Sequence, residues 1–381
     1  MIPRTVFGES HDLLRENVRK FLEAEAVPYH DQWEEQGAVS RDFWREAGSL
    51  GILAPNVDPQ FGGLGADYLY NAVINEEIAG LGLSGVGFQL HSDIAVPYIS
   101  RLGTPEQKAR YLPKCVSGDC IMAIAISEPG TGSDMQGIRT NAVKDGDDYI
   151  LNGSKIFITN GQLADTVIVV AKTDSDAGSK GFSLFLIDRD MPGFTRGKNL
   201  KKLGMKAQDT SELFFSDVRV PKSNVLGELG QGFAYLMQEL PQERLTNAVG
   251  FTAMCESMLK ITTDYVKERK AFGKPVAAFQ NTQFKLAEMD THLTGLRVFI
   301  DRCLDLHVQG QLDDVSAAKA KLWASEVLCR IADECVQLHG GYGYMWEYPI
   351  ARFYADARGS RIYAGTDEVM KIIISRSLLA A

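Results

Sequence analysis

A carboxylate beside irregular backbone is the first group in this chain that could do chemistry. Glu243 lies in the segment MQELPQERL, two residues after Pro241 and next to Arg244. The apolar residues that follow are spaced as on one face of a long helix. Pro241 either begins that helix, where its missing N–H costs nothing, or lies inside it and bends it. An acid held there could serve as a general base, whereas most glutamates near a helix start stay in solvent and favour the positive end of the helix dipole.

A glycine-rich loop is the second candidate. Residues 127–134 read SEPGTGSD, and their glycines free backbone N–H groups from regular structure, with the hydroxyls of Ser127 and Ser133 alongside. Such a loop could meet a phosphate or a flat polar ring. It lacks the GK[ST] of a P-loop and the GxGxxG of a Rossmann fold, and taken alone it equally fits a surface turn.

An aromatic residue and a hydroxyl follow at the end of a predicted strand. Residues 155–161 read KIFITNG, and the two-residue period of a strand places Phe157 and Thr159 on one face. This pair could cover and hydrogen-bond a planar cofactor. The alternative is a plain strand that ends in an Asn-Gly turn.

Three further segments lie at predicted helix ends. In ERKAFGK, Arg269 suits a helix C-terminus and equally a pyrophosphate. In QLHGGYGY, paired glycines allow a ligand or another backbone to approach closely. His339 in that segment lacks a second ligand at metal spacing, so we expect no metal site. In RIYAGTDEVM, Thr366 caps the last helix, whose N-terminus could hold a dinucleotide.

Three blocks of secondary structure must position these segments. Residues 1–121 show helical spacing, with helix caps predicted at Ser10, Ser40 and Thr104. The block that follows, up to residue 225, is rich in the β-branched and aromatic runs of strands.

The strand block carries two predicted hairpin turns, at Asp145-Gly146 and at Asn152-Gly153. Because no helical pattern separates its strands, we expect an antiparallel domain and not a doubly wound sheet.

The third block is again helical. Helices are predicted from Phe233 or Pro241 to about Arg269, then over about 282–307, from after Asp314 to Leu338, and over about 367–379. Helices of this length, apolar over much of their surface, pack as a bundle and often bury a further face in an oligomer.

Composition limits the class of protein. The chain has 381 residues and a net charge of −9, which argues against a nucleic-acid or anionic-membrane partner. Its six cysteines show neither a CxxC pair nor zinc spacing, which favours reduced thiols in a cytosol-like compartment. The first residues lack the apolar segment of a signal peptide, and no run of about 18 apolar residues spans a membrane. We therefore expect a cytoplasmic protein of bacterial type, or a mitochondrial-matrix protein whose presequence has been removed.

The motifs, taken together and in order, resemble those of one enzyme family. EPGTGSD, FITNG, RKAFGK, QLHGGYGY and YAGTDE all match motifs of the acyl-CoA dehydrogenase family, and LPQERL resembles its long-chain branch in particular. The resemblance implies an α+β multidomain fold with an N-terminal α-helical domain (1–121), a middle antiparallel β-barrel-like domain (122–225) and a C-terminal four-helix bundle (226–381). It also implies a homotetramer that passes electrons to electron-transferring flavoprotein.

The resemblance implies FAD as the cofactor. The positions that match flavin contacts are Ile124, Ile126, Ser127, Gly132, Ser133, Phe157, Ile158 and Thr159, the last of which bonds the ring near N5. The positions that match contacts across a subunit interface are Arg269, Phe272, Phe279 and Gln280. The rest of the dinucleotide site is matched by Gln337, Leu338, Gly340, Gly341, Thr366 and Glu368. The positions that match substrate contacts are Ser133, Phe233, Arg244, Ala364 and Gly365.

The family's reaction converts an acyl-CoA thioester to a trans-2-enoyl-CoA, with a base for the α-proton and flavin N5 for the β-hydride. A carboxylate at its ordinary pKa of about 4.3 is too weak a base until burial raises that value. The developing enolate needs donors, which the resemblance assigns to a flavin ribityl hydroxyl and the Ala364 N–H. Many members carry the base in Tyr-Glu-Gly-Thr, but this chain reads Tyr363-Ala364-Gly365-Thr366. We therefore expect the base at Glu243, where long-chain and isovaleryl-CoA dehydrogenases place it, with Arg244 supporting the site.

Other functions stay open at the level of sequence. The substrate could be isovaleryl-CoA or another branched or bulky acyl-CoA. An acyl-CoA oxidase is less favoured, because such chains usually carry a further C-terminal domain. A catalytically silent flavin- or CoA-binding scaffold is supported only by the missing acid at Ala364.

Overall fold

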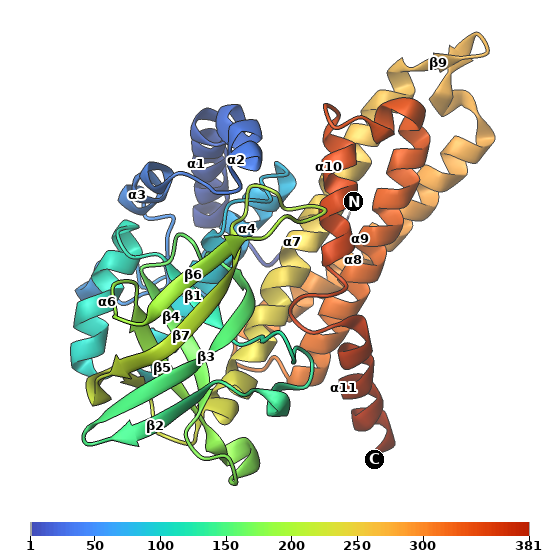
Figure 1. The fold of residues 1–381 in the computed structure, drawn as a ribbon. Coiled ribbons are helices and arrows are strands. Elements are labelled where there is room, and N and C mark those ends of the chain that lie inside the picture. The colour runs from blue at the N-terminus through green and yellow to red at the C-terminus, as the bar shows by residue number, and fades with distance from the viewer. Residues whose placement is uncertain (1, 381) are drawn as a thin grey trace.

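The computed structural model describes residues 2–380 as a helical N-terminal part, a central sheet and a C-terminal set of long helices (Figure 1). The N-terminal helices are α1 (Glu9–Glu25), α2 (His30–Gln36), α3 (Arg41–Ser49), α4 (Tyr68–Gly80), α5 (Val96–Leu102) and α6 (Pro105–Ser117). A π-helical segment, Leu90–Ala95, runs directly into α5 and was not predicted. Such segments are rare and are often found near functional sites.

Side-chain caps explain where two of these helices begin. Ser40 Oγ accepts a hydrogen bond from the N–H of Phe43 at 3.2 Å, and Thr104 Oγ1 accepts one from Gln107 at 3.2 Å. Both caps were predicted. The predicted cap at Ser10 is wrong, because α1 begins after Gly8 and Ser10 is already its second residue.

The central sheet is mostly antiparallel. Its strands are β1 (Met122–Ala125), β2 (Asn141–Asp145), β3 (Asp148–Thr159), β4 (Thr166–Lys172), β5 (Phe182–Asp188), β6 (Phe194–Asn199), β7 (Thr210–Val220) and β8 (Val225–Leu226). They follow the order β6-β7-β3-β2-β4-β5-β8, with β1 paired to β4 outside this path. The pairings of β1 with β4 and of β2 with β4 are parallel, and each of these pairs is joined by a longer connection and not by a hairpin.

One of the two predicted hairpin turns is correct. Asp145-Gly146 lies at the turn between β2 and β3, but Asn152-Gly153 lies inside β3. The register of β3 against β7 shifts at this point, and Gly153 has a φ of +151°. A Cβ at Gly153 would lie 2.4 Å from Thr140 Oγ1. The glycine therefore marks a β-bulge with close backbone approach and not a turn.

The C-terminal part consists of helices that lie largely side by side (Figure 1). They are α7 (Gly232–Glu268), α8 (Gln280–Val308), α9 (Asp314–His339), α10 (Pro349–Gly359) and α11 (Asp367–Leu379). Of these, α10 was not predicted. Helix α7 is continuous through Pro241, so this proline lies inside the helix and does not begin it.

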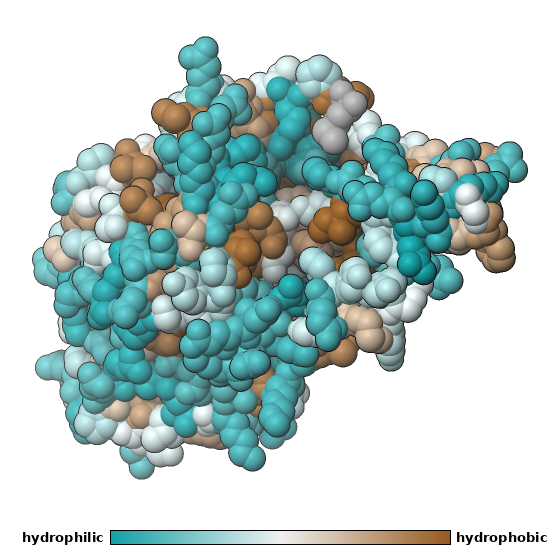
Figure 2. All heavy atoms as spheres, turned by 90° about the horizontal axis from the view of Figure 1, so that it is seen from above, coloured by the Kyte–Doolittle hydropathy of each residue, from teal (hydrophilic) through white to brown (hydrophobic). Residues whose placement is uncertain are grey.

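Two short strands between α7 and α8, β9 (Lys270–Ala271) and β10 (Lys274–Pro275), form a hairpin at the end of the bundle. Seen from above, this end of the molecule is an arm at the right of Figure 2, and hydrophobic residues gather around a hollow on a mostly hydrophilic face. None of the helices in residues 2–380 is both long and apolar enough to cross a bilayer.

Candidate functional site

Glu243 is buried within the fold. It is 7% exposed, and the hydroxyl of Tyr98 on α5 donates a hydrogen bond to its Oε1 at 3.3 Å. Burial raises the pKa of Glu243 to about 7, the Tyr98 bond and Arg244 lower it, and the nearby carboxylate of Glu239 raises it. A carboxyl group with a pKa near 7 is suited to act as a general base at neutral pH.

The face of α7 that carries Glu243 continues into a cavity. Asn247, Gly250 and Met254 follow Glu243 at successive helical turns, so they lie on the same side of the helix. All three line a cavity that α4 and the loop after it bound on one side and Tyr363 on another. A ligand that reaches Glu243 could therefore extend along α7.

A buried ion pair holds the glycine-rich loop. Lys155 Nζ lies 2.9 Å from Glu128 Oε1 and donates to the carbonyl of Ile126 at 2.9 Å. The Glu128 carboxylate also accepts hydrogen bonds from the N–H groups of Arg139 and Thr140. Strand β3 thus fixes the path of the loop. Neither partner of this ion pair is predicted from the sequence to have a role, although both lie in motifs described above.

The glycine-rich loop and the end of β3 lie side by side, since the N–H of Ile156 donates to the carbonyl of Ser127 at 3.0 Å. Phe157 has a φ of +62° and is 67% exposed. The register of β3 shifts between residues 155 and 158, so the alternation predicted for Phe157 and Thr159 is interrupted. A large exposed aromatic residue in a left-handed conformation is strained, and such strain clusters at ligand sites.

Other residues predicted for the flavin differ in what they expose. Ile124 and Ile158 are 8% and 2% exposed, so little of either side chain is open to a ligand. Gly132 and Ser133 are exposed on the loop, and Ile126 and Ser127 are half-buried. A Cβ added at Gly132 would meet no atom within 4 Å, so packing within the chain leaves room beside this backbone.

A second group of predicted residues meets at the far end of α7. Arg269, Gln337, Leu338, Gly340 and Gly341 all line one concavity of about 610 Å³. Its guanidinium and amide groups are donors of the kind that bind a pyrophosphate or a nucleobase.

The hairpin next to this concavity and the start of α8 each carry an aromatic ring. The centroids of Phe272 and Phe279 are 6.2 Å apart, and Gln280 is the first residue of α8. Phe272 is 95% exposed at a φ of +50°. An apolar ring this exposed contacts little of its own chain.

The segment before α11 turns sharply. Ala364 and Gly365 have φ values of +54° and +87°, and Lys321 Nζ donates to the carbonyl of Gly365 at 2.6 Å. Thr366 caps α11 by accepting from the N–H of Val369 at 3.3 Å, as predicted. Within residues 2–380, no backbone acceptor receives the Ala364 N–H. This donor is therefore free to meet a ligand oxygen.

The remaining predicted residues lie on α7 and at the start of α11. Phe233 is half-buried near the start of α7, 6.2 Å from the ring of Phe182. Arg244 is buried and pairs with Asp314 at the start of α9. Glu368 is exposed in the first turn of α11.

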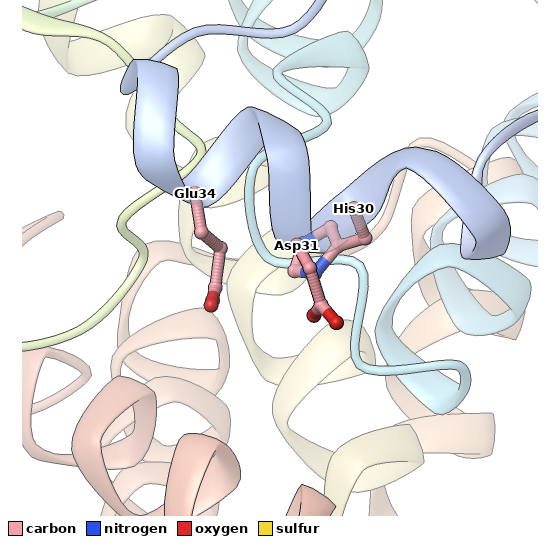
Figure 3. Close-up of side chains that lie close together, drawn as sticks. All are labelled: His30, Asp31 and Glu34. Carbon is pink, nitrogen blue, oxygen red and sulfur yellow. The ribbon is translucent and has the colours of Figure 1, made fainter. Parts of the chain in front are cut away.

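Three potential metal ligands, His30, Asp31 and Glu34, project from α2 with ligand atoms within 4.8 Å of one another (Figure 3). Asp31 accepts a hydrogen bond from Arg352, and Glu34 Oε2 accepts one from the Trp346 indole at 3.0 Å. Both carboxylates therefore fasten α2 to the C-terminal part, which explains the cluster without an ion.

Comparison with known proteins decides the family. Family models of the acyl-CoA dehydrogenase N-terminal, middle and C-terminal domains match residues 8–119, 123–218 and 230–379. The chain is 54% identical to the long-chain specific acyl-CoA dehydrogenase, mitochondrial, of Rattus norvegicus, over 99% of this chain and 88% of the relative. This chain belongs to the acyl-CoA dehydrogenase family.

Solved acyl-CoA dehydrogenases have the same fold. The crystal structure of an acyl-CoA dehydrogenase from Geobacillus kaustophilus superposes with a TM-score of 0.97 at 51% identity, over 99% of this chain and 100% of that chain. An acyl-CoA dehydrogenase complexed with FAD from Bacillus anthracis superposes at 0.92 and 32% identity, over 98% of this chain and 68% of that one. The predicted family, fold class, enzyme class and FAD cofactor are confirmed.

Two separate groups of residues in this acyl-CoA dehydrogenase fit different parts of an FAD cofactor. The exposed ring of Phe157 and the open space beside Gly132 suit a flat ring system. The concavity around Arg269 suits the anionic dinucleotide end.

Proposed function

We propose that this acyl-CoA dehydrogenase acts on long-chain acyl-CoA thioesters and that Glu243 removes the α-proton. One observation carries the choice of base: the buried Glu243 carboxyl, whose pKa is raised to about 7. Ala364, where many relatives have an acid, has no group that accepts a proton.

The chain's own residues have distinct tasks in this reaction. Glu243 accepts the proton from the substrate α-carbon, and its burial keeps the proton affinity high enough for that task. The Ala364 N–H donates to the thioester oxygen, where negative charge develops as the proton leaves. FAD, when bound, would supply the acceptor for the hydride of the β-carbon. The product is a trans-2-enoyl-CoA.

The preference for long chains is supported by two observations. The rat relative that is 54% identical carries the name of a long-chain enzyme. The cavity along α7 begins one turn beyond Glu243 and continues past Gly250 to Met254, which is the direction that a long acyl tail would take away from the reacting carbons.

The cofactor residues divide between the two ends of FAD. We assign Phe157, Thr159 and the loop from Ile124 to Ser133 to the flavin. We assign Gln337, Thr366 and Glu368 to the dinucleotide, and Arg269 to FAD that is held across a subunit interface. Phe233, Arg244 and Gly365 are proposed to contact the acyl-CoA.

We also propose a homotetramer in which the hairpin with Phe272, together with Phe279 and Gln280 at the start of α8, reaches a partner subunit, since Phe272 is 95% exposed. Electron-transferring flavoprotein would reoxidise the flavin. We place the domain divisions after residues 121 and 225. A reducing, cytoplasm-like compartment is supported by six free cysteines.

Anaerobic mixing with a panel of saturated acyl-CoA thioesters tests both parts of the proposal. We expect bleaching of the flavin absorbance, fastest with long straight chains, and a loss of several orders of magnitude in Glu243→Gln with FAD still bound. Glu23→Gln, which changes an exposed carboxylate on α1, serves as the matched control.

Different outcomes overturn different parts. A sharp maximum with a five-carbon branched thioester would replace the long-chain assignment by isovaleryl-CoA. Near-normal turnover in Glu243→Gln would remove Glu243 from the reaction. No bleaching with any thioester would favour a silent flavin-binding scaffold.

A further inference from the structure

Several ionisable groups lie around Glu243 without transferring a proton in the reaction described above. Helix α5 supplies Tyr98 and Arg101, and α7 itself supplies Glu239 and Arg244. Each can change how readily the Glu243 carboxyl holds its proton.

Tyr98 contacts the Glu243 carboxyl directly, with its hydroxyl 3.3 Å from Oε1. The ring of Tyr98 is fully buried, and burial together with the carboxylates of Glu243 and Glu239 raises the pKa of its hydroxyl well above the usual value. The hydroxyl therefore stays protonated and donates its hydrogen to Glu243.

The π-helical segment Leu90–Ala95 sets the direction of Tyr98. It runs into α5 only two residues before Tyr98. Because an α-helix turns by about 100° per residue, an extra residue in a turn rotates every following side chain by about that angle. The contact with Glu243 thus depends on this local irregularity.

Glu239 acts on Glu243 in the opposite sense. It lies one helical turn before Glu243 on α7, is 4% exposed and pairs with Arg101. Arg101 also donates to Gln242 Oε1 at 3.1 Å, which ties the end of α5 to this turn of α7. A second carboxylate one turn away disfavours a negative charge on Glu243.

Other titratable groups near this turn are directed elsewhere. His307 on α8 contacts Gln242 Oε1, and burial lowers the pKa of its imidazole to about 4, so it is neutral at neutral pH. Asp93 in the π-helical segment accepts from Asn71 at 2.6 Å. Arg244 is turned toward Asp314 on α9.

We propose that Tyr98 is a positioning residue for the base: its hydroxyl orients the Glu243 carboxyl and stabilises the ionised form, while Glu239 opposes that ionisation. This inference rests on the proposed role of Glu243. Removal of the Tyr98 hydroxyl takes away a hydrogen bond to the charged form, and removal of the Glu239 charge takes away a repulsion. The two changes must therefore shift the proton affinity of Glu243 in opposite directions.

The pH profile of kcat/KM for a long-chain acyl-CoA tests this inference, because it reports groups on the free holoenzyme. Activity should rise with pH as Glu243 loses its proton. In Tyr98→Phe the rise should move about one pH unit higher, which is about a tenfold loss of kcat/KM on its lower part, with the loss in kcat and not in KM. In Glu239→Gln the rise should move to lower pH.

Tyr68→Phe is the matched control, since Tyr68 is also buried but its hydroxyl bonds to Thr246 and not to a carboxylate. Its profile should keep the wild-type midpoint. FAD content and melting temperature are measured for every variant. If Tyr98→Phe does not retain FAD, the direction of the shift in Glu239→Gln decides alone.

The results separate this inference from the choice of base. An inactive Glu243→Gln combined with wild-type midpoints in both Tyr98→Phe and Glu239→Gln overturns the inference and leaves the base in place. Shifts of the two variants in the same direction overturn it as well, because a general loosening of the site would give that result. An active Glu243→Gln removes the base itself.

Discussion

Replacement of Glu243 by glutamine should raise the free energy of unfolding at alkaline pH, although the same change should almost abolish turnover. Burial raises the pKa of Glu243 from an ordinary 4.5 to about 7 in the folded protein. A raised pKa means that the folded state prefers the protonated, neutral acid. This acid therefore contributes stability below about pH 4.5, and that contribution is lost as the pH rises to about 7.

The size of the effect follows from the shift. A difference of roughly 2.5 pKa units corresponds to about 3 kcal/mol, at about 1.36 kcal/mol per unit. Glutamine has nearly the same shape as glutamate, carries no charge and can still accept the Tyr98 hydrogen bond. Above pH 7 the variant should therefore be more stable than the wild type by up to about 3 kcal/mol, and at pH 4.5 the two should be nearly equal.

Melting temperatures of both holoenzymes between pH 5 and pH 8 measure this difference. Glu23→Gln, with an exposed carboxylate on α1, should show no comparable dependence on pH. A gap between Glu243→Gln and wild type that stays constant across this range would refute the reasoning. So would a variant that is less stable than the wild type at pH 8.

Two further predictions concern the cofactor and the assembly. Lys155→Met leaves Glu128 as a buried, unpaired charge, which costs about 3–5 kcal/mol, so the variant should have a lower melting temperature and lose FAD on gel filtration. The control Lys144→Met, which changes an exposed lysine, should keep the wild-type melting temperature and FAD content. Unchanged FAD content in Lys155→Met would show that the ion pair does not hold the loop. Phe272→Ser should give smaller assemblies by light scattering and less bound FAD, because an apolar ring that is 95% exposed in one chain is expected to pack on a partner subunit. An assembly of wild-type size would contradict the proposed interface.

Sequence patterns predicted the features that depend on neighbouring residues. The helix from Asp367, capped by Thr366, is an example, because its cap and its charges act within one turn. The contact between Tyr98 and Glu243 gave no such signal. These residues are 145 positions apart and meet only because α5 packs on α7.

Local patterns also failed where the fold overrode them. Asn-Gly commonly makes a hairpin turn, but at Asn152-Gly153 the strand continues through a β-bulge. The glycine is needed there because Thr140 leaves no room for a side chain. In the same way, the alternation expected through Phe157 is interrupted where the end of β3 meets the glycine-rich loop.

The proline within α7 has a mechanical consequence. Pro241 carries no N–H, so the carbonyl of Met237 lacks the donor that a regular helix would provide four residues later. One main-chain hydrogen bond of the helix is therefore missing just before Glu243. We expect α7, the longest of the described helices, to bend more easily at this point than elsewhere, and Glu243 lies in the first turn after it.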